Sequence, residues 1–280
     1  MFEHGCIAKF TLGKPRKPSL LRAVAACALA ISALSLSSAH AQSTPPLRIA
    51  AAADLQPLLP PILEQFQHAT GIRAETTYQA SAALTAQIQN GAPFDVFLSA
   101  DLSYPKRLIE VGVATGSSAS PTIPITYARG TLVLWTRTDS KWPKPSLATL
   151  SDPHLQRLAI ANPERAPYGR AAVAALTSLK LIDSLKSKLV TAENISQAAQ
   201  FAETGNADAG LISLTSAKTA HLQSAGSYFI IPGNLYPTIE QGAAIIANSK
   251  HSQYSHRFLD FLLSAPIQQQ LATSGLTPVR

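Results

Sequence analysis

The sequence predicts an α/β fold in which strands and helices alternate. Two observations support this prediction. Between residues 47 and 110, short runs of small and β-branched residues alternate with segments whose large apolar residues recur at helical spacing. A second series of the same kind runs from Thr131 to about Thr273. Strands that alternate with helices favour a parallel sheet, and two such series are compatible with two α/β lobes.

The first series consists of three strand–helix pairs. The first helix is expected to begin properly near Pro60, because Pro57, Pro60 and Pro61 remove backbone donors from the apolar segment that starts at Leu55. The dipeptide Asn90-Gly91 is a stop signal for the second helix. The predicted strands are 47–53, 72–78 and 94–99, and the second and third helices are 82–89 and 102–110.

The second series follows a connection rich in Ser, Thr and Pro at residues 116–125, which we expect to be ordered. Its strands and helices alternate between residues 157 and 212, further strands follow, and two consecutive helices end the chain. The predicted strands are 131–137, 157–161, 188–192, 208–212, 228–231 and 242–247, and the predicted helices are 169–179, 195–204, 252–263 and 267–273.

Residues 1–41 are predicted to be a cleavable signal peptide. An apolar run from Ala23 to Leu36 is followed by Ala39-His40-Ala41, so cleavage is expected after Ala41. A lipid-anchored alternative uses Cys27, but the apolar run continues past that cysteine, where a lipobox should end. Five basic residues precede or open the apolar run: Lys9, Lys14, Arg16, Lys17 and Arg22.

Charge and cysteine content exclude several functional classes for the exported part. The whole chain has a net charge of +7, but the leader holds five basic residues and one acidic residue, which leaves 18 basic and 15 acidic residues, or +3. No basic cluster with interleaved aromatic residues is present, so nucleic-acid binding is not expected. Both cysteines lie in the leader, which excludes a disulfide framework and cysteine-bound metals after cleavage.

Three turns between a strand and a helix have the character of anion sites. They are AAAADLQP at 50–57, the start of the helix after Tyr78, and NPERAPYGRAA at 162–172. Backbone N–H groups at a helix N-terminus, together with a nearby hydroxyl, can bind an oxyanion without a charged partner. The three turns therefore predict a small oxyanion held between two lobes.

These segments carry a family resemblance. AAAADL at 50–55, YQASAALTAQIQNGAPFDVFLSAD at 78–101, NPERAPYGRAA at 162–172 and NADAGLI at 206–212 are similar to the periplasmic molybdate-binding proteins of ABC importers. The resemblance implies a type II periplasmic-binding-protein fold with two α/β lobes joined by crossover strands and a ligand cleft between them. By the family's pattern, lobe one takes residues 43–126 and 239–280, and lobe two takes residues 127–238.

The same resemblance implies the function. It predicts a monomer that binds molybdate, and also tungstate, in the periplasm and delivers it to the membrane permease of an ABC transporter. No cofactor, no catalytic residue and no direct metal ligand are expected, since molybdenum is bound as its oxyanion. The family's binding positions fall on Asp54, on Ser81, on the hydroxyl of Tyr168 and on the backbone N–H of Ile195.

Asp54 departs from the family pattern, because many relatives have serine or asparagine at this position. A carboxylate next to a dianion in a poorly hydrated cleft would be repelled by several kcal/mol. One hypothesis is that Asp54 contributes only its backbone N–H, while its side chain caps the first helix. Another is that Asp54, or the ligand, carries a proton.

Alternative functions are the same fold with another ligand and a secreted hydrolase. Arg165 and Arg170 flank Tyr168 and keep open sulfate, a phosphonate, a sulfonate or a small organic acid as the ligand. Ser103 and Lys106 fit an S-x-x-K pattern, but the companion motifs of that enzyme class are missing, so an enzyme is not expected. Asp101 is interpreted as an ordinary cap of the helix that follows it.

Overall fold

The computed structural model describes residue 13 and residues 45–279. The chain divides into one unit that ends at Thr44 and a compact unit that begins at Pro45. Apart from Gly13, the predicted signal peptide, its cleavage site after Ala41 and the alternative lipid site at Cys27 lie outside the described residues.

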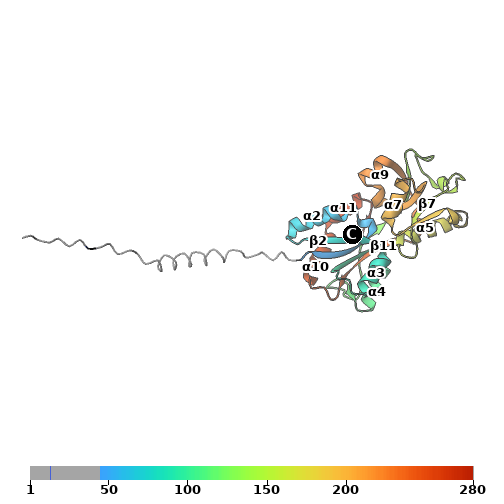
Figure 1. The fold of residues 1–280 in the computed structure, drawn as a ribbon. Helices are drawn as coiled ribbons and strands as arrows, with labels where there is room; N and C mark the ends of the chain where they lie inside the picture. The colour runs from blue at the N-terminus through green and yellow to red at the C-terminus, as the bar shows by residue number, and fades with distance from the viewer. Residues whose placement is uncertain (1–12, 14–44, 280) are drawn as a thin grey trace, which may run out of the picture. The chain divides into compact units, whose positions relative to one another are not determined.

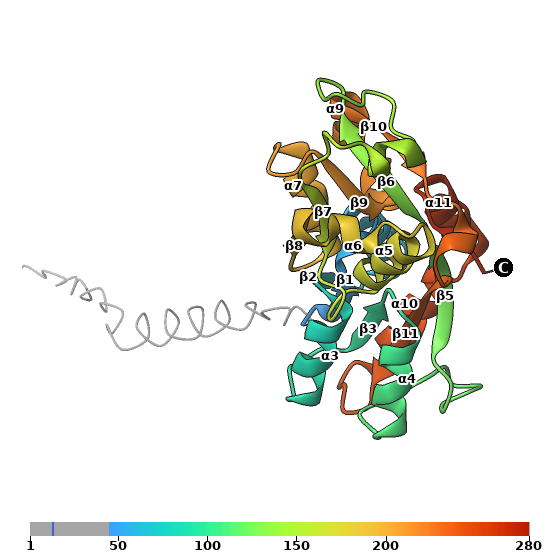
Figure 2. The same ribbon diagram turned by 90° about the vertical axis from the view of Figure 1, so that its right-hand side faces the viewer.

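The compact unit contains two β-sheets (Figures 1 and 2). The first sheet has the order β12-β5-β11-β3-β1-β2, with β4 beside β11, and the second has the order β10-β6-β9-β7-β8. Strands of the first sheet are β1 (Leu47–Ala52), β2 (Ala74–Gln79), β3 (Val96–Ser99), β4 (Ala114–Thr115), β5 (Ile125–Gly130), β11 (Ile239–Ile246) and β12 (Thr277–Pro278). Strands of the second sheet are β6 (Leu132–Arg137), β7 (Leu158–Ala161), β8 (Leu189–Ala192), β9 (Ala209–Ser213) and β10 (Gly226–Ile230).

Helices pack around both sheets, and Figure 2 shows α3 and α4 with the first sheet and α5 and α7 with the second. The helices that follow first-sheet strands are the short 3-10 helix η1 (Ala53–Leu55), α2 (Leu59–Thr70), α3 (Ser81–Gln89), α4 (Ser103–Glu110), α10 (Ser252–Leu262) and α11 (Ala265–Thr273). Those between second-sheet strands are η2 (Leu147–Ser151), α5 (Pro167–Ser178), α6 (Ile182–Leu185), η3 (Lys186–Lys188), α7 (Ile195–Glu203), α8 (Leu214–Ala217) and α9 (Ala220–Ala225), and η4 (Gly233–Leu235) precedes β11.

Helix α2 illustrates how local sequence sets the element boundaries. Pro60 and Pro61 lie in its first turn, where no backbone donor is needed, so the predicted start near Pro60 is confirmed. The helix ends at Gly71, whose φ of 73° is the left-handed conformation that glycine adopts without strain. Its buried face carries Phe66, which packs edge-on against Phe258 of α10 with ring centroids 5.4 Å apart.

The predicted α/β class is confirmed, but the sheets are mixed and not purely parallel. Strand β1 is parallel to β2 and β3, and β7 is parallel to β8 and β9. Strands β11 and β6 are antiparallel to their neighbours. Strand β5 was missed by the sequence analysis, because only two of its six residues are buried and it therefore lacks a clear periodic signal.

The chain passes between the sheets twice. Strand β5 pairs within the first sheet and is followed, after Thr131 alone, by β6 of the second sheet. The return path leads from β10 through residues 231–238 to β11, which pairs with β5, so the two crossings lie side by side where Ile239 is opposite Gly130. The predicted division into lobes at residues 43–126 with 239–280 and 127–238 stays a prediction.

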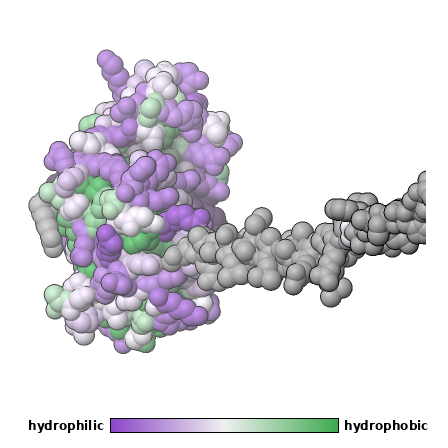
Figure 3. All heavy atoms as spheres, turned by 90° about the vertical axis from the view of Figure 1, so that its left-hand side faces the viewer, coloured by the Kyte–Doolittle hydropathy of each residue, from purple (hydrophilic) through white to green (hydrophobic). Residues whose placement is uncertain are grey.

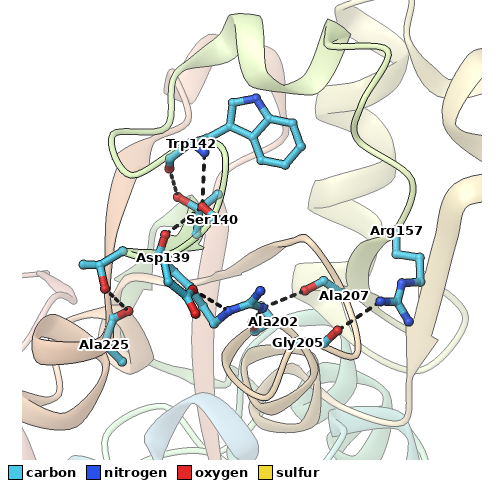
Figure 4. A network of polar contacts seen from close by, with 11 residues as sticks. Asp139, Ser140, Trp142, Arg157, Ala202, Gly205, Ala207 and Ala225 are labelled. Atoms are coloured by element: carbon cyan, nitrogen blue, oxygen red, sulfur yellow. Dashed lines mark hydrogen bonds and ion pairs between the residues drawn. The ribbon is translucent and has the colours of Figure 1, made fainter.

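Helix α7 is held at its C-terminal end by Arg137 (Figure 4). The guanidinium donates to the carbonyl oxygens of Ala202, at 3.0 Å, and Ala207, and it also pairs with Asp139 at 2.9 Å. Arg157 donates to the carbonyl of Gly205 in the same region. A cation beside the last carbonyls of a helix satisfies free acceptors and interacts favourably with the helix dipole. These contacts fix the direction in which the N-terminus of α7 points.

The surface of the compact unit is mixed in character. On the face drawn in Figure 3, hydrophilic residues predominate and hydrophobic residues gather toward the middle. Within residues 45–279, no helix combines the length and the apolar composition needed to cross a membrane.

The contact between α5 and β7 leads to a stability prediction. A Cβ atom at Gly169 would overlap the carbonyl oxygen of Ala161 and lie 2.8 Å from its carbonyl carbon, and these backbone atoms cannot turn aside. We expect Gly169→Ala to lower the free energy of unfolding by about 1–3 kcal/mol, because α5 must move away from the sheet. Gly233→Ala is the matched control, since its Cβ would meet no atom within 4 Å. Equal urea midpoints for the two variants would contradict the prediction.

Candidate functional site

The four predicted site residues lie around one small cavity. Its volume is about 10 Å³. Asp54, Ser81, Tyr168 and Ile195 all line it, together with Ala52, Ala53, Gln79, Ala80, Ala100, Ala166, Pro167 and Asn194. The structure therefore brings together the four residues at which the family resemblance placed the binding positions.

The cavity lies where four strands end. Strand β1 leads into η1, β2 leads into α3, β7 leads through residues 162–166 into α5, and β8 leads into α7. These strands run parallel within their sheets, so their carboxyl ends meet on the same side, which is the usual ligand-binding position in α/β proteins. The first two strands belong to the first sheet and the other two to the second, so the site is built from both sheets.

Ser81 is the first residue of α3 and is fully buried. Its hydroxyl oxygen accepts a hydrogen bond from the backbone N–H of Ala100 at 3.1 Å. A hydroxyl that accepts in this way still has its own hydrogen to donate. Ser81 can thus act as a donor toward the cavity, whereas the next amide of the helix, that of Ala82, already donates to the carbonyl of Arg165 at 3.1 Å.

Ile195 is the first residue of α7, and its side chain is buried in the core of the second sheet, as expected. The preceding Asn194 caps the helix by accepting from the N–H of Gln197 at 3.0 Å. The first amides of a helix have no partner inside the helix, so the N–H of Ile195 is a donor at the cavity wall. Ser196 links this helix to the first sheet, because its hydroxyl donates to the carbonyl of Ala53 at 2.8 Å.

Asp54 is fully buried in η1, and its carboxylate does not cap a helix. The capping hypothesis is therefore wrong. One carboxylate oxygen, Oδ2, accepts from the hydroxyl of Tyr168 at 3.0 Å and from the side-chain amide of Gln241. These two donors come from α5 and β11. The carboxylate accepts from them and not from the free N–H groups of η1, which is only three residues long.

Burial determines the acidity of Asp54. Loss of hydration raises its pKa from the ordinary value of 3.8 to about 6, and the hydrogen bonds from Gln241 and Tyr168 lower it against that effect. The other oxygen, Oδ1, is buried without a hydrogen-bond partner, as is Oε1 of Gln241. Asp54, which lines the cavity, and its neighbour Gln241 thus each have one buried acceptor atom that lacks a donor.

Tyr168 is fixed by its surroundings. Its ring is 1% exposed, and it lies in the first turn of α5 after Pro167. The hydroxyl rests on Gly130, where a Cβ atom would overlap it and would lie 2.9 Å from the ring carbon that carries it. The phenol therefore occupies the point where the chain passes from the first sheet to the second.

The charged residues near the site have partners of their own. Arg165 pairs with Glu193 at 3.0 Å on the surface. Arg170 pairs with Asp101 and donates to the hydroxyl of Tyr104 at 3.0 Å. Neither arginine lines the small cavity. The carboxylate of Asp101 also accepts from the N–H of Ser103, the first residue of α4, at 2.7 Å, but the N-cap position itself is Leu102 and not Asp101 as expected.

Gln241 and Thr215 are polar residues at the site that the sequence analysis missed. The hydroxyl of Thr215 donates to the carbonyl of Asp54 at 2.8 Å. Gln241 is fully buried in β11, which begins at Ile239, whereas the predicted strand began only at residue 242. A glutamine next to the apolar run 242–246 is itself a signal, because a buried amide in a strand needs a polar partner. Within the described residues, no group of three or more His, Cys, Asp or Glu side chains forms a metal site.

The buried carboxylate predicts a pH-dependent stability. Because the folded protein holds the Asp54 proton more tightly than the unfolded chain, its stabilising contribution is complete below about pH 3.8 and is lost as the pH rises through 6. At about pH 7.5 the ionised carboxylate costs on the order of 3 kcal/mol. Asp54→Asn should therefore unfold at a higher temperature than the unsubstituted protein at about pH 7.5, and the gap should shrink toward about pH 5. A gap that does not change with pH would contradict this.

Comparison with known proteins places the chain in a family. A model of bacterial extracellular solute-binding proteins matches residues 47–277. The molybdate-binding protein ModA of Azotobacter vinelandii is 37% identical over 221 residues, which are 77% of this chain and 83% of that protein. ModA of Rhodobacter capsulatus is 36% identical over 197 residues, which are 70% and 74% of the two chains.

The structural comparison agrees. The solved structure of the Azotobacter vinelandii periplasmic molybdate-binding protein is 30% identical, covers 84% of this chain and 100% of its own, and superposes with a TM-score of 0.77. The expected type II periplasmic-binding-protein fold and the family resemblance are thereby confirmed. The chain belongs to the bacterial extracellular solute-binding proteins, and the relatives reported above that match most of its length are molybdate-binding proteins.

Proposed function

We propose that this protein binds molybdate, and also tungstate, between Asp54, Ser81, Tyr168 and Ile195, where the cavity, which has room for about one water molecule, must widen to admit the anion. One observation carries the proposal: the chain is similar to molybdate-binding proteins over most of its length, and the four binding positions inferred from that similarity lie around a single cavity. Asp54 and Ser81 come from first-sheet segments, and Tyr168 and Ile195 come from second-sheet segments. A ligand between them would hold the two sheets together.

The available donors suit a tetrahedral dianion. The hydroxyl of Ser81 and the N–H of Ile195 are neutral donors at helix N-termini, where the helix dipole favours negative charge. Each hydrogen bond to a charged oxygen contributes about 1.5–3 kcal/mol. About five to seven of them, less the costs of closure and desolvation, account for roughly −8 to −12 kcal/mol, which corresponds to micromolar to nanomolar affinity. No ion pair with the ligand is required, so release remains possible.

The biological setting is part of the proposal. The protein would be exported by the signal peptide of residues 1–41, act in the periplasm as a monomer, and deliver the anion to the membrane permease of an ABC transporter. It would release its ligand chemically unchanged, with no cofactor. The similarity of the chain to the molybdate-binding proteins of Azotobacter vinelandii and Rhodobacter capsulatus supports this setting.

Isothermal titration of the purified, anion-free protein tests the proposal directly. We expect molybdate to bind one-to-one with a dissociation constant of about 1 µM or lower. The same result is expected with sulfate present in large excess. Absence of heat with molybdate, or complete competition by sulfate, would mean that the fold holds a different anion.

Removal of the Ser81 hydroxyl should weaken binding without unfolding the protein. Ser81→Ala deletes one charge-assisted donor, so molybdate affinity should fall by roughly 10- to 150-fold, which corresponds to about 1.5–3 kcal/mol. Ser103→Ala is the control, since Ser103 is exposed at the start of the next helix, α4. An unchanged dissociation constant for Ser81→Ala would remove Ser81 from the ligand contacts.

A further inference from the structure

The hydrogen of the Tyr168 hydroxyl already takes part in a hydrogen bond within the protein. A phenol has one hydrogen, and that of Tyr168 is donated to Oδ2 of Asp54 at 3.0 Å. In this arrangement Tyr168 has only lone pairs left to present to the cavity. An oxyanion also has only lone pairs. Tyr168 can therefore donate to the ligand only if its hydrogen bond with Asp54 is reversed.

The negative charge of Asp54 also opposes the binding of an oxyanion. The carboxylate lines the cavity, its Oδ1 has no partner, and the described residues form no ion pair with it. The titratable groups that face Asp54 or its partner Tyr168 are the phenols of Tyr127, Tyr168 and Tyr236. Burial raises the pKa of each phenol above its ordinary value, so all three stay neutral near physiological pH. A dianion would thus meet an uncompensated negative charge.

We propose that binding of the oxyanion is coupled to the uptake of one proton by Asp54, which reverses the hydrogen bond between Asp54 and Tyr168. This inference rests on the proposed function, because the ligand is the dianion assigned there. The proton comes from the solvent and forms an O–H bond on Oδ2. That group donates to the phenol oxygen of Tyr168, and the phenol hydrogen turns toward the oxyanion.

Proton uptake with reversal of the hydrogen bond removes two obstacles to binding, namely the negative charge of Asp54 and the lack of a free hydrogen on Tyr168. The charge of the loaded cavity falls from three negative charges to two, and Tyr168 becomes a donor to the ligand. Gln241 continues to donate to the remaining lone pair of Oδ2. Burial has already raised the pKa of Asp54 to about 6, and repulsion from the bound dianion must raise it further, above the pH of the measurement, for the carboxyl to hold a proton in the complex. Through this proton uptake, Asp54 makes binding of the oxyanion stronger in slightly acidic surroundings.

Proton uptake can be measured directly. Molybdate is titrated into the protein at about pH 7.5 in two buffers of different ionisation enthalpy, and the difference in heat gives the number of protons taken up. We expect close to one proton per molybdate for the unsubstituted protein and none for Asp54→Asn. Between about pH 7 and pH 8.5, the dissociation constant should rise about tenfold per pH unit for the unsubstituted protein and stay constant for Asp54→Asn.

Two further variants complete the test. Asp183→Asn removes an exposed carboxylate on α6 and should keep the uptake and the pH dependence of the unsubstituted protein. Tyr168→Phe should weaken binding at least tenfold, because the ligand loses a donor. Circular dichroism spectra and thermal melts establish that each variant is folded.

The outcomes separate this inference from the proposed function. Molybdate binding with no proton uptake, uptake that persists in Asp54→Asn, or unchanged affinity in Tyr168→Phe would each overturn the inference and leave molybdate binding intact. Failure of every protein to bind molybdate would overturn the proposed function itself.

Discussion

A carboxylate buried between two sheets, with no cation from residues 45–279 paired with it, is the constraint on which the rest of the site depends. Asp54 is fully buried and relies on two neutral donors, Tyr168 from a second-sheet helix and Gln241 from a first-sheet strand. Neutral donors stabilise a carboxylate less than a cation does, so part of the desolvation cost remains and appears as a raised pKa. The same contact joins the sheets, so the ionisation of one residue is linked to their closure.

The fold concentrates binding groups because of its topology. In each sheet two parallel strands end on the same side, and each of the four leads into a helix whose first residues line the same small volume. Hydrogen bonds between segments of the two sheets, such as Ser196 to Ala53 and Thr215 to Asp54, surround that volume. A pair of adjacent crossing strands is the only covalent connection between the sheets within the described residues. A ligand at this position therefore contacts both sheets with few residues.

Much of this arrangement could be predicted from the sequence, and the failures have physical reasons. Apolar periodicity located most strands and helices, and motif similarity placed all four site residues around one cavity. Strand β5 was missed because its burial has no period. The hypothesis that the Asp54 side chain caps the first helix was wrong because its partners lie 114 and 187 residues away along the chain. Local capping rules cannot account for donors that only the tertiary fold brings together.

The contact between Tyr168 and Gly130 restricts which pairs of residues can occupy these two positions. Any side chain at position 130 would occupy the space of the phenol hydroxyl, so the two positions are not independent. A chain that keeps tyrosine at position 168 must leave position 130 bare, and a chain that gains a side chain at 130 must shorten residue 168. Aligned sequences with this architecture should change the two positions together, although 38 residues separate them along the chain.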